Sequence, residues 1–321
     1  MSVPGHTLPG VNPAATTPPT DDRPAAPRPP ALSPSRAADF KRCPLLYRFR
    51  AIDRIPEVPS RAQLRGSLVH AALEALFTLP AADRLPAPAA ELVAPAWRRL
   101  VEHEPALAEV IGEDQRDRFL AEARALLARY FTLEDPTAFT PEECELRVET
   151  DLDDGPRLRG FVDRLDISPQ GLLRVVDYKT GRSPRPDGEA AALFQLKFYA
   201  LVMLRTRGVV PARLRLLYLA DGQVLDYTPD QDELRRFETT LRALWAAVRT
   251  ATDARDFRPN PGPLCRWCDH RVRCPAFGGT APPYPDRPDE HAGADRPDEH
   301  AGADRPDEHA GADRTEEETN E

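Results

Sequence analysis

Two aspartates and one lysine carry the clearest chemical signal in the sequence. Asp163 lies in a largely apolar stretch over residues 157–167, and Asp177 and Lys179 lie in a second such stretch over 172–179. Each stretch has the composition and length of a strand. The residues between them predict a hairpin with a three-residue loop that ends in glycine. A loop of that length would place Asp163 directly across from Asp177.

This arrangement suits a divalent metal ion. Facing carboxylates repel each other, and their side-chain roots would be only about 5 Å apart. Hard cations prefer oxygen ligands, and Lys179 would project on the same face. Two acids, a metal ion and an ammonium group can orient a water molecule and neutralise a phosphate transition state. The alternative is an exposed cluster of salt bridges, which the apolar residues expected beside Asp163 disfavour: Phe161, Leu165 and Ile167.

The remaining periodicity predicts helices around a small sheet. Helices are expected over 33–43, 61–79, 90–103, 114–131, 190–207 and 231–250, and further strands over 144–151 and in a hairpin at 213–228. The order of these elements predicts an α/β domain around a small mixed sheet, with extra flanking helices.

The two ends of the chain differ from its centre. Residues 1–31 are rich in proline, and residues 279–321 repeat DRPDEHAGA three times. Neither can bury enough apolar surface to offset the entropy of ordering, so we expect disordered tails around one folded domain over 32–278. The formal net charge of −9 belongs to the C-terminal tail, which holds 14 acidic residues and four arginines.

Two classes of location are disfavoured by the sequence. It has no run of about 18 apolar residues, which excludes a predicted membrane span. Its N-terminus lacks the charged and then apolar pattern of a secretory signal, so we expect a cytoplasmic protein. Cysteines in such a protein are metal ligands or free thiols more often than disulfides.

Four of the five cysteines have the spacing of a metal site. Three form C-x2-C-x5-C near the end of the domain and one lies at the end of the first predicted helix: Cys43, Cys265, Cys268 and Cys274. Four thiolates can hold a zinc ion or an iron–sulfur cluster. Spacing alone favours zinc, with His270 as a possible substitute ligand. Cys144 stands outside the pattern and is expected to pack in the interior.

Gly160-Phe161-Val162-Asp163-Arg164-Leu165-Asp166, followed by Asp177-Tyr178-Lys179-Thr180-Gly181, resembles the motifs of RecB-family exonucleases in the PD-(D/E)XK nuclease superfamily. The resemblance implies a restriction-endonuclease-like core of α-β-β-β-α-β order. It also implies that Asp163, Asp177 and the main-chain carbonyl of Tyr178 bind Mg²⁺ or Mn²⁺, and that Lys179 is the catalytic lysine.

Two predicted helices and the cysteines extend the resemblance. His70 matches the metal-binding histidine of the family, and Gln195 and Tyr199 match its Q-x-x-x-Y motif. The cysteine pattern resembles the branch that includes AddB-type proteins and CRISPR-associated exonucleases. That resemblance implies a 4Fe–4S cluster that staples the two ends of the domain, held by Cys43, Cys265, Cys268 and Cys274.

These expectations describe a metal-dependent DNA nuclease, an exonuclease on single-stranded ends, that works in DNA repair or recombination. The sequence lacks a G-x-x-x-x-G-K-[ST] motif, so a helicase or recombination partner would be a separate chain. Two alternatives stay open: a catalytically inactive, metal-stapled DNA-binding module, and a scaffold for a separate helicase. The intact Asp163, Asp177 and Lys179 disfavour the inactive module.

Overall fold

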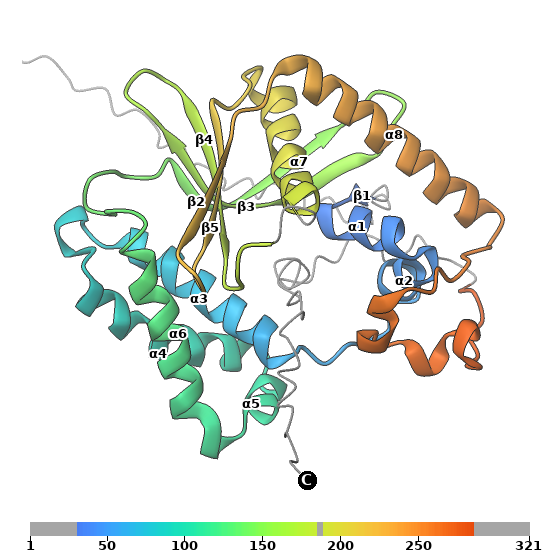
Figure 1. Cartoon of the computed structure of the whole chain (residues 1–321), viewed down its shortest axis with the longest axis horizontal. Helices are drawn as coiled ribbons and strands as arrows, with labels where there is room; N and C mark the ends of the chain where they lie inside the picture. The colour runs from blue at the N-terminus through green and yellow to red at the C-terminus, as the bar shows by residue number, and fades with distance from the viewer. Residues whose placement is uncertain (1–30, 185–188, 286–321) are drawn as a thin grey trace, which may run out of the picture.

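A mixed sheet is the centre of the fold in a computed structural model, which describes residues 31–184 and 189–285 (Figure 1). Six strands form the sheet within these residues: β1 (Ala31–Leu32), β2 (Glu143–Asp151), β3 (Arg157–Ile167), β4 (Leu173–Lys179), β5 (Arg213–Tyr218) and β6 (Gln223–Tyr227). Five strands lie in the order β1-β3-β4-β5-β6, and β2 pairs with β3. The β1–β3 and β4–β5 pairs are parallel and the others antiparallel. The predicted small mixed sheet is confirmed.

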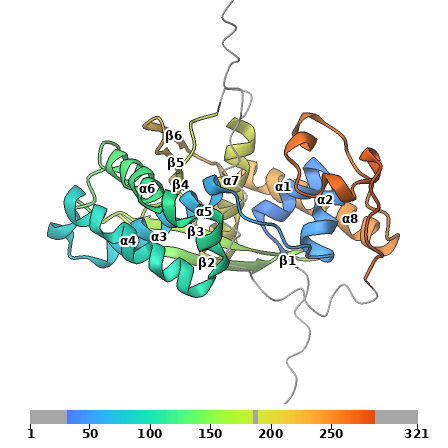
Figure 2. The same cartoon turned by 90° about the horizontal axis from the view of Figure 1, so that it is seen from below.

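Helices cover both faces of this sheet (Figures 1 and 2). They are α1 (Pro34–Arg42), α2 (Pro44–Tyr47), α3 (Arg61–Thr78), α4 (Pro86–His103), α5 (Ala106–Ile111), α6 (Arg116–Tyr130), α7 (Glu189–Arg207) and α8 (Gln231–Asp253). Apolar residues of α3, α4 and α6 form one core cluster with Val176 and Leu217 of the sheet. Those of α1, α7 and α8 form a second cluster with Val175 and Leu216.

Local sequence fixes where the first helices begin. Ser33 caps α1, as predicted, by accepting a hydrogen bond from the main-chain N–H of Arg36 at 3.3 Å. Ser60 and Gln63 form a reciprocal capping box at the start of α3, with bonds of 3.2 and 2.8 Å. These bonds satisfy main-chain donors that the first turn of a helix leaves open. The cap of α3 sets the start of the helix that carries His70.

The β3–β4 hairpin has the predicted register. Gly171 closes the turn with φ of +77°, a conformation that glycine adopts without strain. Arg164 pairs with Val176, and one further step would pair Asp163 with Asp177. Pairing ends at Arg164 and Val176, however, so the two strands part where the aspartates lie.

The predicted alternation along β3 is wrong at this point. Val162, rather than Phe161, joins Leu165 in the core cluster on the α7 side of the sheet. The pairs on either side of Glu145 in the β2–β3 ladder place Glu145 across from Asp163. Glu145 has φ of +50°, which is rare for a residue other than glycine. This left-handed residue interrupts regular pairing, and the period of two in β3 is interrupted opposite it.

The packed part of the chain reaches beyond the expected limits of 32 and 278. Ala31 is buried in β1. At the other end, the Nη2 of Arg48 donates to the carbonyl of Pro282 at 2.5 Å, and the ring of Tyr284 stacks on that of Phe257. The rest of the expected tails, residues 1–30 of 1–31 and residues 286–321 of 279–321, lies outside the described residues. Within 31–184 and 189–285, the helices are too short or too polar to span a bilayer.

Candidate active site

Asp163, Asp177 and Lys179 come together where β3 and β4 separate. Their exposed fractions are 2, 1 and 8%, which argues against the alternative of an exposed salt-bridge cluster. The Nζ of Lys179 lies 2.7 Å from Oδ2 of Asp177. The main-chain N–H of Tyr178 donates to Oδ2 of Asp163 at 2.7 Å. Asp163 therefore accepts the hydrogen bond of an amide that lies beyond the end of the β3–β4 ladder.

Burial changes the acidity of Asp177. Desolvation raises the pKa of Asp177, the Lys179 ammonium lowers it and the charge of Asp163 raises it, which leaves the pKa at about 6 instead of 3.8. A cation close to both carboxylates would favour their ionised forms. The pair is therefore a candidate site for a positive ion.

α3 brings His70 to this carboxylate pair. The Nε2 of His70 lies 3.0 Å from the carbonyl oxygen of Tyr178, and its Nδ1 lies 3.5 Å from Oδ2 of Asp163. The helix is held in place by its buried residues Leu68 and Ala72. The sequence analysis expected His70, Asp163 and the Tyr178 carbonyl at one metal site. These three groups come from separate parts of the sequence and are adjacent in the structure.

Glu145 is a candidate metal ligand that the sequence analysis missed. Its Oε1 lies 3.9 Å from Nδ1 of His70. One ligand atom each from His70, Glu145 and Asp163 lie within 4.8 Å of one another. The signal in the sequence is an acidic residue inside the strand predicted over 144–151. Recognising it requires the β2–β3 register, which the sequence analysis did not derive.

α7 supplies hydrogen bonds that orient Lys179. The Nζ of Lys179 donates to Oε1 of Gln195 at 2.9 Å, and the Nε2 of Gln195 donates to the hydroxyl of Tyr199 at 3.2 Å. Tyr199 packs on β3 at Gly160, where an added Cβ would lie 2.8 Å from its Cε1 atom. The predicted Gln195 and Tyr199 pair therefore does lie beside the candidate catalytic lysine.

Arg164 holds Tyr178 from the other side. Its guanidinium is fully buried, and its Nη1 donates to the Tyr178 hydroxyl at 2.7 Å. Asp166 and Glu134 balance its charge, with N–O distances of 3.0 and 2.8 Å. Tyr178 is thus fixed at three points: its ring by Arg164, its amide by Asp163, and its carbonyl beside His70.

Comparison with known proteins identifies the family of the chain. The sequence pattern of the PD-(D/E)XK nuclease superfamily matches residues 31–275. The chain belongs to this superfamily. The family is one of nucleases, and the expected superfamily is confirmed.

Two phage proteins and one solved structure resemble this member of the superfamily. The chain is 36% identical over 129 residues to the Gene 69 protein of Mycobacterium phage L5. This alignment covers 39% of this chain and 41% of the phage L5 protein. It is 26% identical over 278 residues to the Gene 69 protein of Mycobacterium phage D29. This alignment covers 77% of this chain and 97% of the phage D29 protein. An exonuclease candidate from Eubacterium rectale aligns with a TM-score of 0.52 at 14% identity, over 75% of this chain and 87% of that chain.

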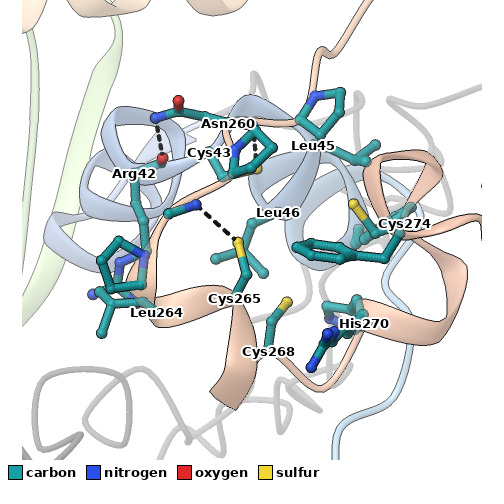
Figure 3. A pocket seen from close by; sticks show the side chains of 17 residues that line it. Arg42, Cys43, Leu45, Leu46, Asn260, Leu264, Cys265, Cys268, His270 and Cys274 are labelled. Atoms are coloured by element: carbon teal, nitrogen blue, oxygen red, sulfur yellow. Dashed lines mark hydrogen bonds between the residues drawn. The ribbon is translucent and has the colours of Figure 1, made fainter.

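The cysteines of this nuclease-family chain meet at a second site. Four cysteines from the two ends of the superfamily match line one cavity of about 230 Å³: Cys43, Cys265, Cys268 and Cys274 (Figure 3). The main-chain N–H groups of Asn260 and Gly262 donate to the Sγ atoms of Cys43 and Cys265, each at 3.3 Å.

His270 lines the same cavity but makes a different contact from the one expected. Its Nε2 lies 2.6 Å from Oε1 of Glu57, and its ring packs edge-on against Phe49. Burial acts to raise the pKa of Glu57, but hydrogen bonds from His270 and Arg50 outweigh it and lower the pKa to about 2. The imidazole thus joins the cysteine segment to the chain before α3 through its Nε2 atom.

Proposed function

We propose that this protein is a Mg²⁺- or Mn²⁺-dependent nuclease that hydrolyses single-stranded ends of DNA in repair or recombination. The observation that carries the proposal is the pair of buried aspartates, Asp163 and Asp177, with Lys179 beside Asp177 and His70 beside Asp163. A buried carboxylate pair is costly without a cation. Its place in a chain of the PD-(D/E)XK superfamily makes phosphodiester hydrolysis the chemistry that best accounts for that cost.

The residues around the pair form a fitting donor set for a divalent ion. Carboxylates, a carbonyl and an imidazole are available from His70, Glu145, Asp163, Asp177 and Tyr178. Oxygen-rich sets of this kind suit Mg²⁺ and Mn²⁺. The bound ion would supply a counter-charge for the phosphate and lower the pKa of a water molecule.

Lys179 is the group that we assign to the reacting phosphate. Asp177 and Gln195 hold its ammonium from two sides, at 2.7 and 2.9 Å, so the charge is oriented before substrate arrives. A preorganised positive charge stabilises the charge that develops on the phosphate in the transition state. Gln195 and Tyr199 are positioning residues in this proposal.

We also propose that the four cysteines hold a 4Fe–4S cluster. Zinc binds sulfur at about 2.3 Å in a tetrahedron, which places the sulfur atoms about 3.8 Å apart. The four cysteines line one cavity of about 230 Å³. A cubane is larger than a single ion and takes four thiolate ligands. The cluster would join Cys43 to the segment that holds the other three cysteines.

Incubation of end-labelled single strands with the protein and Mn²⁺ tests the proposed activity. We expect cleavage that requires the metal and that is lost in Asp163→Ala. Binding without cleavage by the parent protein would favour the alternative of an inactive DNA-binding module. The separate helicase remains a prediction, which purification of the complex from its host would test.

A further inference from the structure

The segment that carries three of the cysteines also carries five exposed residues within eight positions: Arg266, Trp267, Arg271, Val272 and Arg273. Trp267 is 52% exposed and Val272 is 78% exposed. Neither residue lines the cysteine cavity, so a group bound there would not cover them. We call these five residues the tryptophan–arginine surface.

The charge of this surface comes from its three arginines. Several arginines elsewhere pair with acids, as Arg157 does with Asp151 at 2.9 Å. Among the residues that the structure describes, no carboxylate oxygen lies within 4.0 Å of the guanidinium of Arg266, Arg271 or Arg273. Two of them lie over aromatic rings instead: Arg266 is 5.3 Å from the centroid of Trp267, and Arg271 is 4.7 Å from that of Phe277.

We propose that the tryptophan–arginine surface binds single-stranded DNA outside the active site, an inference that rests on the proposed nuclease function. A flat aromatic ring can stack on any base, and arginines beside it can contact the phosphates on either side. Trp267 is assigned to a base, and Arg271 and Arg273 to phosphates. Paired bases hide their faces, so the surface favours single strands over duplex DNA.

The surface is connected to the candidate active site through the start of α3. His270 lies between Trp267 and Arg271 in the sequence and contacts Glu57, four residues before α3 begins. From Arg61 to His70 the helix rises about 14 Å, at 1.5 Å per residue. We infer that a strand bound at the surface needs further nucleotides to reach the metal ligands, so that only strands longer than a few nucleotides reach both places.

Binding of a fluorescein-labelled dT20 strand by the full-length protein, followed by anisotropy without divalent metal, tests the proposal. We expect Trp267→Ala to weaken binding about tenfold, and Trp267→Phe to recover most of the loss. Arg273→Ala should weaken binding and reduce the slope of log affinity against log salt by about 0.7, as for one lost phosphate contact. Val224→Ala, which removes an exposed apolar side chain from β6, is the matched control and should bind as the parent does.

Cleavage with Mn²⁺ separates this surface from the reaction itself. For the 20-mer, Trp267→Ala should raise KM about tenfold with kcat unchanged, whereas cleavage of a trinucleotide should be unaffected. If the parent binds and cuts dT20 and both Trp267→Ala and Arg273→Ala do so equally well, the surface does not bind DNA and is instead a contact for another protein. If the parent neither binds nor cuts single strands, the proposed nuclease function itself fails.

Discussion

Tyr199 packs so closely on Gly160 that an added Cβ atom at Gly160 would lie 2.8 Å from its Cε1 atom. This contact joins β3 to α7 three residues before Asp163. Through its hydroxyl, Tyr199 also accepts the hydrogen bond that orients Gln195, which in turn accepts one from Lys179. The glycine at the start of the G-x-x-D-R-x-D segment therefore has a physical role: it admits the tyrosine that supports the lysine.

Gly160→Ala is expected to lower the cleavage rate and the free energy of unfolding together. Overpacking of a buried contact costs about 1–3 kcal/mol, and the displaced Tyr199 ring would no longer support Gln195. Chemical denaturation and single-turnover cleavage measure the two effects. In a Tyr199→Ala background the same substitution should cost little, because the clash is gone. An equal cost in both backgrounds would contradict the contact.

Lys179→Arg should fold normally and bind DNA, yet cleave at least about a hundredfold more slowly. The ammonium of Lys179 is enclosed between Asp177 and Gln195, where a planar guanidinium cannot take its place. Only three residues of the chain are lysines, against 40 arginines, so a lysine here is unusual. Lys197→Arg is the matched control, because an arginine can keep the ion pair with Glu233. Equal rates for Lys179→Arg and the parent would remove Lys179 from the reaction.

Asp177 gives the metal-free protein a specific dependence of stability on pH. Burial raises the pKa of Asp177 to about 6 from 3.8 in the unfolded chain. Between these values the folded state holds a proton that the unfolded state has lost, so the free energy of unfolding falls as pH rises, by up to about 3 kcal/mol. Below pH 3.8 and above pH 6, Asp177 adds nothing further to the dependence of the free energy of unfolding on pH.

Urea unfolding of the chelator-treated protein from pH 4 to 7 measures this effect. Asp177→Asn cannot titrate, so its free energy of unfolding should fall less over this range, and it should exceed that of the parent at pH 7 by about 2–3 kcal/mol. Other titratable groups also change the free energy of unfolding with pH. They are the same in the two proteins, so their effect cancels when the two curves are compared. Identical curves would show that Asp177 titrates at its ordinary pKa.

The sequence predicted the candidate site as far as local rules reach. The three-residue loop at Gly171 set the β3–β4 register, and the register set Asp163 against Asp177. The point where pairing stops was not predictable, because it depends on the bond between Asp163 and the Tyr178 amide. Glu145 was missed for a related reason: its left-handed backbone and its place across from Asp163 appear only once β2 is paired with β3.

The cysteine pattern illustrates the same limit. Its spacing correctly grouped four residues that are up to 231 positions apart, since they line one cavity. Spacing could not reveal that the neighbouring His270 contacts Glu57, a residue in a loop before α3.

The proposed cluster would colour the protein and stabilise its fold. The anaerobically purified protein should be brown and contain about four irons per chain. Cys265→Ser should lose the colour and much of the stability, because the staple between the two ends of the domain is removed. Cys144→Ser, outside the cavity, should do neither. A colourless protein that contains one zinc ion per chain would contradict the cluster. In that case a zinc ion would link Cys43 to the other three cysteines.

The central claim is that the buried carboxylates hold a metal ion for cleavage of DNA. The most direct measurement is single-turnover cleavage of an end-labelled strand at increasing Mn²⁺, by the parent and by Asp163→Asn, with the binding of the strand followed in parallel. The account predicts a rate that saturates with Mn²⁺ in the parent, and a loss of at least about a thousandfold in the variant with DNA affinity kept. Cleavage without metal, or a variant as fast as the parent, would contradict it.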